Sequence, residues 1–284
     1  MNDSLTISPM THDEASELAA WAAAEGWNPG NADIAVAWDT DPEAFIALRR
    51  GSELIGGGTI FSYDGRFGFM GLFIVRPEWR RAGFGARLWS ERLRRLKARL
   101  RPGAVIGMDG VFAMVPFYEK GGFRLAHKDL RFAGTAIGVA DPTVRPLDQS
   151  HFPEIERFDR QHVAAPRAAF LRRWIFQPGR HAVGMFDDGE VTGYGVLRPA
   201  RSGFKIGPLF ARDADIAERL TGTLLAQAEG QPVQLDVPEP NEAGLRLAAR
   251  FGLKEVFGCA RMYHGPTPDL RLKQIFGVTS FEFG

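Results

Sequence analysis

One stretch of the sequence limits the possible folds more than any other. The apolar run Phe67–Val75, rich in aromatic and branched residues, predicts a buried strand that ends before Pro77. From Gly85 onward, apolar residues recur at helical spacing between Leu88 and Leu100 with arginines among them, which predicts an amphipathic helix. A strand joined to a helix by a short glycine-bearing loop indicates a mixed α/β fold.

The loop between this strand and helix has the features of an anion site. The first turn of a helix leaves backbone N–H groups unpaired, and the helix dipole adds partial positive charge there. Gly83 and Gly85 remove side chains so that a phosphate can approach the backbone, while Arg80 and Arg81 add charge. The pattern predicts binding of a phosphate-bearing ligand; a plain turn and helix start is the structural alternative.

Two other phosphate-binding loops fit this segment less well. A P-loop requires a lysine followed by serine or threonine after its glycines, and this chain has Ala86 and Arg87 there. A dinucleotide-binding fingerprint requires a third glycine, where Leu88 stands. The spacing Arg-x-x-Gly-x-Gly therefore belongs to neither class.

The same order of predicted elements occurs twice along the chain, which indicates two α/β (α+β) domains. The first half is predicted to contain a helix at 15–24, strands at 45–49, 54–63 and 67–75, a helix from 85, a strand at 104–108, a helix at 111–120 and a strand at 123–132. The second half is predicted to contain a helical region at 151–176, strands at 182–186, 191–197 and 203–210, a helix at 215–229, a strand at 232–237, a helix at 241–251, a strand at 253–263 and a less regular tail. Small residues and prolines at 134–144 place the boundary so that the domains are 1–138 and 139–284.

The glycine loop resembles the pyrophosphate-binding signature of the GNAT superfamily of acyl-CoA N-acyltransferases, Arg/Gln-x-x-Gly-x-Gly/Ala. The resemblance implies a mixed, twisted sheet that is splayed at the cofactor, flanked by helices. It also implies that acetyl-CoA is the cosubstrate. By this resemblance the pantetheine arm would be lined by Phe73, Ile74 and Val75, and the pyrophosphate would be held by Arg80, Arg81, Ala82, Gly83, Phe84 and Gly85.

A second segment, 116–123, resembles the later GNAT motif Phe-Tyr-x-x-x-Gly-Phe. The tyrosine of that motif commonly protonates the departing thiolate, and Tyr118 matches it. The asparagine and alanine that usually precede the tyrosine are replaced by Val111 and Met114, so the details of cofactor contact differ from the family pattern. Without the glycine loop, Tyr118 would read as an ordinary core aromatic residue.

The acceptor side is specified less clearly by the sequence. Amine attack on a thioester requires a base and stabilisation of the oxyanion. Glu25 is the first candidate base, with Trp27 and Asn28 as candidate substrate contacts; a helix C-cap and turn is the equal alternative. Asp109 is the second candidate base, or alternatively a cap of the following helix.

The second half shows a weaker resemblance to the same superfamily. Segment 241–253 resembles the later motif, but Ala248 stands where the tyrosine should fall. Asp213 and Asp215 would repel a phosphate at the place of the glycine loop. We therefore expect a degenerate GNAT-like domain. Three roles stay open for it: to support the fold, to complete the acceptor pocket, or to bind another ligand. Its residues Arg261, Tyr263 and Glu282 are interpreted first as ordinary strand or surface residues, with a place in such a pocket as the alternative.

Composition excludes several other classes of function. The net charge of +1 gives no field for nucleic acid or membrane, and a basic cluster is interpreted as a solvated helix face: Arg92, Arg94, Arg95, Lys97, Arg99 and Arg101. The single cysteine, Cys259, is interpreted as a small buried hydrophobic residue of a cytoplasmic protein. The polar start of the chain does not resemble a signal peptide, and the histidines lack metal-ligand spacing.

We expect an N-acetyltransferase, monomeric or homodimeric, that acts on the amine of a small molecule or peptide by direct attack on acetyl-CoA, without a metal. The alternatives are a non-catalytic acyl-CoA-binding sensor and an interaction protein.

Overall fold

The computed structural model describes residues 4–284, so the first three residues of the polar N-terminal segment lie outside it. The first half contains β1 (Leu5–Pro9), α1 (His12–Ala24), α2 (Asp33–Thr40), β2 (Phe45–Arg50), β3 (Glu53–Tyr63), β4 (Phe67–Val75), α3 (Phe84–Ala98), β5 (Val105–Val111), α4 (Val115–Lys120) and β6 (Arg124–Thr135). The second half contains β7 (Arg145–Pro146), α5 (Phe152–Asp159), α6 (Ala168–Phe176), β8 (His181–Asp187), β9 (Glu190–Pro199), β10 (Phe204–Ala211), α7 (Ala214–Ala226), β11 (Pro232–Pro238), α8 (Glu242–Arg250), β12 (Lys254–His264) and β13 (Ile275–Gly277).

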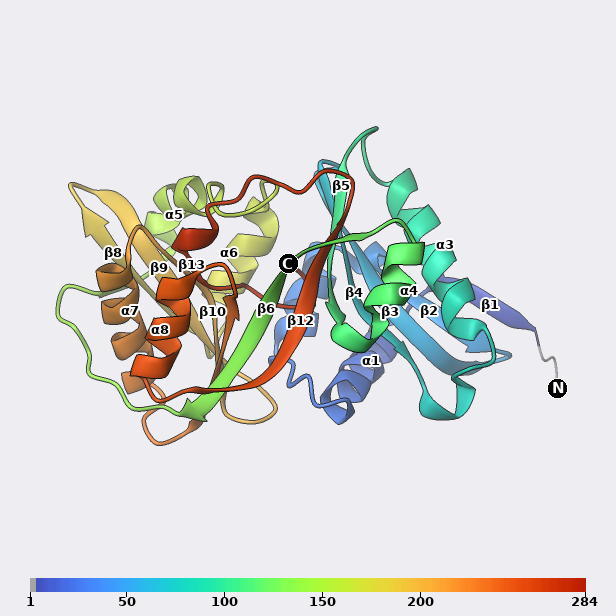
Figure 1. Cartoon of the computed structure of the whole chain (residues 1–284), viewed down its shortest axis with the longest axis horizontal. Coiled ribbons are helices and arrows are strands. Elements are labelled where there is room, and N and C mark those ends of the chain that lie inside the picture. Colours follow the sequence, from blue (N-terminus) through green and yellow to red (C-terminus); the bar gives the residue numbers. More distant parts are fainter. Residues whose placement is uncertain (1–3) are drawn as a thin grey trace.

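One continuous sheet joins the two halves, because each half gives its last long strand to the other. The strand order is β1-β2-β3-β4-β5-β12-β6-β11-β10-β9-β8-β7, with β13 paired to β10. Thus β12 lies between β5 and β6, and β6 lies between β12 and β11. Figure 1 shows these two long strands crossing the middle of the molecule, with the C-terminus beside them. The domains therefore share their central strands.

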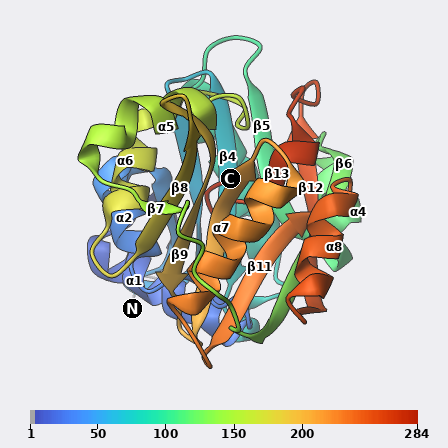
Figure 2. The same ribbon diagram turned by 90° about the vertical axis from the view of Figure 1, so that its left-hand side faces the viewer.

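The helices cover the sheet as two layers. On one face α1 and α2 share a core with α5 and α6, so this core spans both halves. On the other face α3 and α4 pack over the first half, and α7 and α8 over the second. Figure 2 shows α7 and α8 on the side of the second-half sheet opposite α5 and α6. The predicted fold class, a mixed α/β sheet flanked by helices, is confirmed.

Local sequence explains most of these elements. The first turn of α1 is closed by a capping box in which the Thr11 and Glu14 side chains each accept a bond from the other's backbone N–H. The apolar stripe of α3 buries Leu88, Trp89 and Leu96 against the sheet, as its spacing predicts. Cys259 is 4% exposed, which confirms that it is a small buried residue.

Several local predictions were wrong. Helix α2 was not predicted, because its eight residues lack a side-chain cap within the described part of the chain. The helix expected at 111–120 begins only at Val115: β5 continues to Val111 and a 3₁₀ turn follows. Pro116 lies in the first turn of this helix, where proline is tolerated.

Some residues assigned to a solvated face, to the surface or to the irregular tail are buried. Arg92, assigned to a solvated helix face, is fully buried beneath α3 and donates to the backbone oxygens of Thr59 and Gly71. The tail contains β13 and buries Phe281 and Phe283. Arg261, Tyr263 and Glu282, interpreted first as ordinary strand or surface residues, are all buried.

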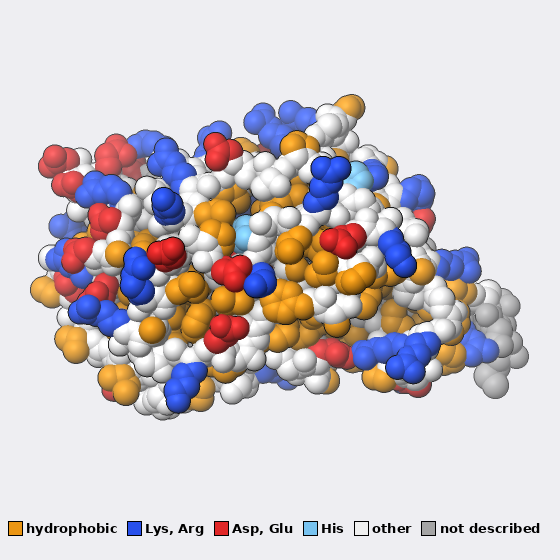
Figure 3. Space-filling model, in the orientation of Figure 1, with side chains coloured by type: hydrophobic (Ala, Val, Ile, Leu, Met, Phe, Trp, Pro, Cys, Tyr) orange, Lys and Arg blue, Asp and Glu red, His pale blue; other side chains and the backbone are white. Residues whose placement is uncertain are grey.

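The surface mixes both signs of charge. In Figure 3 hydrophobic side chains gather over the middle of the face on which β6 and β12 cross, with acidic and basic side chains distributed around them. Between residues 4 and 284 there is no helix long and apolar enough to cross a membrane.

Candidate active site

The sheet of the first half opens between β4 and β5. The two strands pair in parallel at three positions, the last being Phe69 opposite Gly107, and their pairing ends there. Beyond this point β4 carries a bulge, with Leu72 in the left-handed region at a φ of 50°. A bulge releases backbone groups from the ladder, so an N–H of β4 is available at the opening. A cavity of about 390 Å³ occupies this place.

The glycine loop lies at one end of this cavity. Gly83 is the N-cap of α3 and has a φ of 81°, a conformation that favours glycine. No side chain of the described residues caps this helix, so its first amides remain available to an anion. Arg80 and Arg81 line the cavity beside it. The geometry fits the predicted phosphate cradle.

Gly85 leaves the space that such a ligand needs. A Cβ at this position would meet only Phe73 and Val75, at 3.6 and 3.7 Å. The cavity is lined by most of the predicted cofactor residues: Phe73, Ile74, Val75, Arg80, Arg81, Gly85 and Tyr118. The other three, Ala82, Gly83 and Phe84, complete the loop outside this lining, and the Phe84 ring packs on Trp79 at 6.0 Å between centroids.

Tyr118 reaches the cavity from α4. Its ring packs on Trp89 at 4.9 Å, and Gly110 makes room for it, because a Cβ there would lie 2.4 Å from the ring. Burial raises the pKa of Tyr118 to about 12, with Arg92 opposing the shift. The hydroxyl is therefore protonated at neutral pH and chemically suited to donate a proton.

The two candidate bases are both bound to arginines. Glu25, the C-cap of α1, forms an ion pair with Arg80 at the cavity wall. Asp109 does not cap the following helix; both of its oxygens accept from Arg261, at 2.6 and 2.7 Å. Burial raises the pKa of Asp109 well above its usual range, and the neighbouring Asp129 adds to this, although Arg261 opposes it.

The loop after α1 places one residue at the cavity and another against the second half. Trp27 lines the cavity. The Asn28 side chain instead donates to Ser202 and Gln234, both at 3.1 Å, and accepts from the Ser202 N–H at 2.8 Å. Of the predicted substrate contacts, Glu25 and Trp27 therefore face the cavity, and Asn28 connects the halves.

The second half contributes side chains to this cavity. Phe257 and Cys259 of β12, together with Phe281 and Glu282 of the tail, line it. The sequence indicated such a role only as an alternative, and of these residues only Glu282 was named for it. Alternation of apolar and polar residues around Glu282 is typical of an extended segment and was the available signal. Nothing in that alternation indicates which element the segment joins.

The second half contains a similar opening with a different content. Strands β10 and β11 also pair in parallel at three positions, ending at Ile206 opposite Leu235. Beyond this point β13 pairs with β10, at Leu209 and Phe210. The N-terminus of α7 is capped by Asp213, whose carboxylate accepts from the Ile216 N–H at 3.0 Å. In the second half, β13 therefore lies beside β10 where the first half has its opening, and the Asp213 carboxylate occupies the helix N-terminus that is uncapped in the first half.

The described residues contain no group of His, Cys, Asp and Glu able to hold a metal ion.

Comparisons with known proteins agree with this geometry. Residues 12–123 match the model of the "Acetyltransferase (GNAT) family", and residues 155–277 match that of an "Acetyltransferase (GNAT) domain". The chain is 27% identical over 282 residues to holothin acyltransferase from Pseudoalteromonas sp. (strain SANK 73390), covering 98% of this chain and 94% of that protein.

Solved structures show the same fold. A Pyrococcus horikoshii protein classed with the acetyltransferases superposes with a TM-score of 0.83 at 18% identity, over 99% of this chain and 96% of the other. A tandem GNAT protein from the clavulanic acid biosynthesis pathway superposes with a TM-score of 0.64 at 16% identity, over 93% and 100%. The chain therefore belongs to the GNAT superfamily, with two GNAT domains in tandem, and is an acyl-CoA-dependent acyltransferase.

Proposed function

We propose that the protein transfers an acetyl group from acetyl-CoA to a primary amine of a small molecule or peptide. The observation that carries this proposal is that one continuous cavity is lined both by residues of the glycine loop and by Tyr118. The pyrophosphate would lie against Arg80, Arg81 and the amides that follow Gly83, and the pantetheine arm beside β4. The match to acetyltransferase family models supports acetyl as the acyl group.

The proposed reaction is direct attack of the neutral amine on the thioester carbonyl. The carbon–nitrogen bond forms, the nitrogen gives up a proton to a base, and the carbon–sulfur bond breaks as the tetrahedral intermediate collapses. The developing oxyanion requires a preorganised donor, which the backbone at the Leu72 bulge can supply. The departing thiolate takes a proton from the Tyr118 hydroxyl, whose pKa of about 12 keeps that proton in place until then.

We propose that residues 1–138 form the acetyltransferase domain and that the domain of residues 139–284 does not bind acyl-CoA. Two contacts support this. Strand β13 pairs with β10 in the second opening, and Asp213 occupies the N-terminus of α7. The similarity to holothin acyltransferase along nearly the whole chain makes holothin an acceptor to test.

The test is acetyl-CoA binding by calorimetry, comparing the wild type with Gly83→Glu. Gly103→Glu is a matched control, because Gly103 has the same φ of 81° and equally open surroundings but follows the other end of α3. We expect one equivalent of acetyl-CoA to bind the wild type and the control, and Gly83→Glu to lose binding. Turnover is then followed as free thiol released in the presence of holothin, 2-phenylethylamine or tryptamine.

Each outcome decides between functions. Binding with turnover supports the acetyltransferase, and binding without turnover for any amine indicates an acyl-CoA sensor. Two equivalents would refute the inactive second domain. No binding would refute the proposal and favour an interaction protein.

A further inference from the structure

The C-terminal segment 278–284 crosses from the second domain to the open edge of the first. It leaves β13 beside β11, where the Val278 N–H donates to the Asp236 carbonyl at 2.8 Å. It ends against β3, where the Tyr63 hydroxyl donates to the Phe283 carbonyl at 2.5 Å. Arg167 of the second domain donates to the Gly284 carbonyl at 3.0 Å. The segment is thus held from both domains.

This segment passes directly over the bulge of β4. A Cβ on Gly71 would lie 1.9 Å from the carbonyl oxygen of Glu282, so only glycine allows the two backbones to approach this closely. Gly71 directly precedes Leu72, the residue at the bulge. Glu282 is therefore placed beside the point at which the thioester carbonyl would bind.

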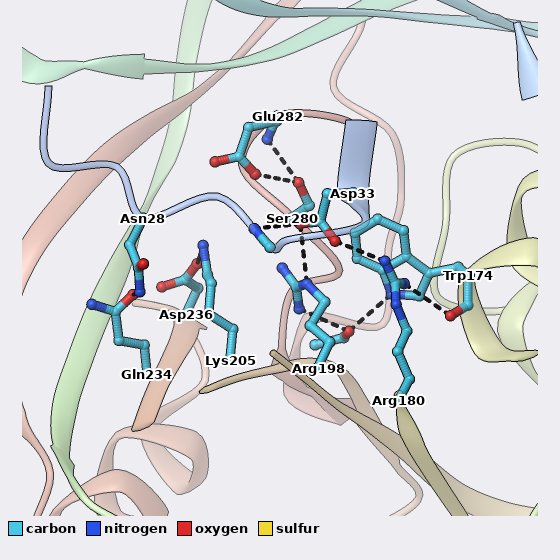
Figure 4. A network of polar contacts seen from close by, with 12 residues as sticks. Asn28, Asp33, Trp174, Arg180, Arg198, Lys205, Gln234, Asp236, Ser280 and Glu282 are labelled. Carbon is cyan, nitrogen blue, oxygen red and sulfur yellow. Dashed lines mark hydrogen bonds and ion pairs between the residues drawn. The ribbon is translucent and has the colours of Figure 1, made fainter. Parts of the chain in front are cut away.

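Glu282 lines the cavity, and its carboxylate has one oxygen bonded within the tail. Its Oε2 accepts from the Ser280 hydroxyl, and the Ser280 oxygen accepts from the Glu282 N–H at 2.9 Å. Figure 4 shows the second oxygen pointing away from Ser280. Within residues 4–284 no hydrogen bond of this oxygen is found, which leaves it available to a ligand in the cavity.

Of the three carboxylates that line the cavity, Glu282 alone is bonded to a hydroxyl rather than to an arginine. Glu25 is occupied by Arg80 at the cofactor end. Asp109 is bound through both oxygens to Arg261, and its side chain is fully buried. Glu282 is the carboxylate best placed to bind a cationic or amine group.

Charged groups from the second domain and from β6 surround Glu282 on its buried side. Lys205 of β10 and Arg131 of β6 both lie close enough for Glu282 to influence their pKa values. Figure 4 shows Lys205, Asp236 and Arg198 below Glu282. The Asp109–Arg261 pair lies on the side of β5 and β12. Cations therefore lie on one side of Glu282, while its bonded oxygen is held by Ser280.

The remaining walls around Glu282 are apolar. Phe257 and Phe281 lie across the Arg131 guanidinium, at 5.5 and 4.8 Å from its carbon, and present their rings to the cavity with Trp27. Such walls fit an aromatic or aliphatic body. A carboxylate beside the acceptor amine would meet Glu282 and be repelled.

We propose that the second domain builds the acceptor subsite of the first domain, and that Glu282 binds and deprotonates the acceptor amine. The acceptor class is a primary amine on an apolar body without a neighbouring carboxylate. This inference rests on the proposed acetyl transfer. In the step, the ammonium form of the amine gives one proton to the free oxygen of Glu282, and the neutral nitrogen then bonds to the acetyl carbon. As the carbon–sulfur bond breaks, the thiolate takes the Tyr118 proton. The nitrogen releases its second proton to solvent, from which Tyr118 is reprotonated. Glu282 returns its proton to solvent after product release.

The experiment compares Glu282→Gln with the rival base variant Glu25→Gln and with Glu255→Gln, an exposed control on β12. Acceptors are holothin, 2-phenylethylamine, tryptamine and phenylalanine, which is 2-phenylethylamine with a carboxylate added. We expect Glu282→Gln to lower kcat by about 10²–10⁴-fold, the range for loss of general base catalysis. It should bind acetyl-CoA as the wild type does and should lose the ascending limb of the pH–rate profile. With phenylhydrazine, whose amine is already neutral at pH 7, Glu282→Gln should lower kcat by a smaller factor.

Failure of the inference and failure of the proposed function give different results. Wild-type turnover with kcat of Glu282→Gln within threefold, or loss in Glu25→Gln alone, would overturn the role of Glu282 and leave acetyl transfer intact. Acetylation of phenylalanine faster than 2-phenylethylamine would overturn the acceptor class. No turnover by the wild type would overturn both proposals. If Glu282→Gln does not fold, Glu282→Asp tests the same point: an unchanged kcat would refute the assignment, and a loss of about tenfold or more with normal cofactor binding would support it.

Discussion

Replacing Gly71 by alanine tests how closely the tail and the β4 bulge depend on each other. The added Cβ would lie 1.9 Å from the Glu282 carbonyl oxygen and 3.0 Å from the Thr59 hydroxyl. Real Cβ atoms essentially never approach other atoms below 3.0 Å, so the tail backbone must retreat by about 1 Å. The nearest atom belongs to the backbone, and rotation of a side chain cannot relieve the contact.

The size of the effect follows from this displacement. Overpacking of a closely packed site costs about 1–3 kcal/mol, and we expect the free energy of unfolding to fall by this amount. A misplacement of about 1 Å in a catalytic group can lower the rate about 100-fold, so kcat should fall by roughly that factor. Acetyl-CoA binding should be nearly unchanged, because the glycine loop is at the other end of the cavity.

For Gly85→Ala we expect the reverse pattern: unchanged stability and weaker acetyl-CoA binding. Its Cβ meets protein atoms only at 3.6 Å or more, so the protein should remain as stable as the wild type. The same methyl group would occupy space proposed for the cofactor, and acetyl-CoA binding should weaken. Unfolding in urea, calorimetry with acetyl-CoA and release of free thiol measure the three quantities. If Gly71→Ala kept wild-type stability and kcat, the close contact between tail and bulge would not exist and the reasoning would be refuted.

Three further predictions concern single side chains. Tyr118→Phe should lower kcat by about 10²-fold or more with unchanged acetyl-CoA binding, because the thiolate loses its proton donor; an unchanged kcat, measured by thiol release, would exclude that role. Arg167→Met should lower the free energy of unfolding by about 3–5 kcal/mol, since it leaves the buried Asp159 without the arginine that binds both its oxygens. Arg157→Met, which breaks an exposed pair, is its control in urea unfolding and should cost much less. Lys205→Met should raise the free energy of unfolding at pH 7 by about 1–3 kcal/mol, because burial and then Arg131 lower the pKa of Lys205 from 10.5 to about 8. Above pH 8 the folded wild type releases this proton before the unfolded chain does, so wild-type stability rises between pH 8 and 10.5. The stability advantage of Lys205→Met should therefore shrink in this range. An advantage that stays constant would contradict the assigned pKa.

Local periodicity was sufficient to predict the part of the site that lies on consecutive elements. Strand β4, the Gly83 loop and α3 follow each other in the sequence, so the apolar run, the glycines and the leucine spacing together predict their order and contact. Tyr118 needed the family resemblance in addition, because an aromatic residue before two glycines has no distinctive physical pattern. In both predictions, each residue is positioned by one short segment of the chain.

The exchange of β6 and β12 could not be predicted in this way. Either strand could complete its own domain, and alternating side chains specify two faces but not the neighbouring strand. The same limit applies to Arg92, whose neighbours in sequence are exposed arginines. Its burial depends on Gly58, where a Cβ would lie 2.4 Å from the guanidinium carbon, and a small residue on another element gives no signal at Arg92 itself.

The two openings in the sheet explain why a duplicated fold would be used asymmetrically. In each domain a short parallel pairing ends and leaves one strand with backbone groups that need partners. In the second domain β13 supplies them to β10, in the position that a cofactor arm would otherwise take. In the first domain the corresponding groups of β4 face the cavity. The segment that closes the second opening then continues to Glu282. If the proposed function holds, the same ten residues that close one cofactor groove complete the acceptor side of the other. On this reasoning the second domain cannot regain acyl-CoA binding without displacing β13, and displacing β13 would also withdraw Glu282 from the first site.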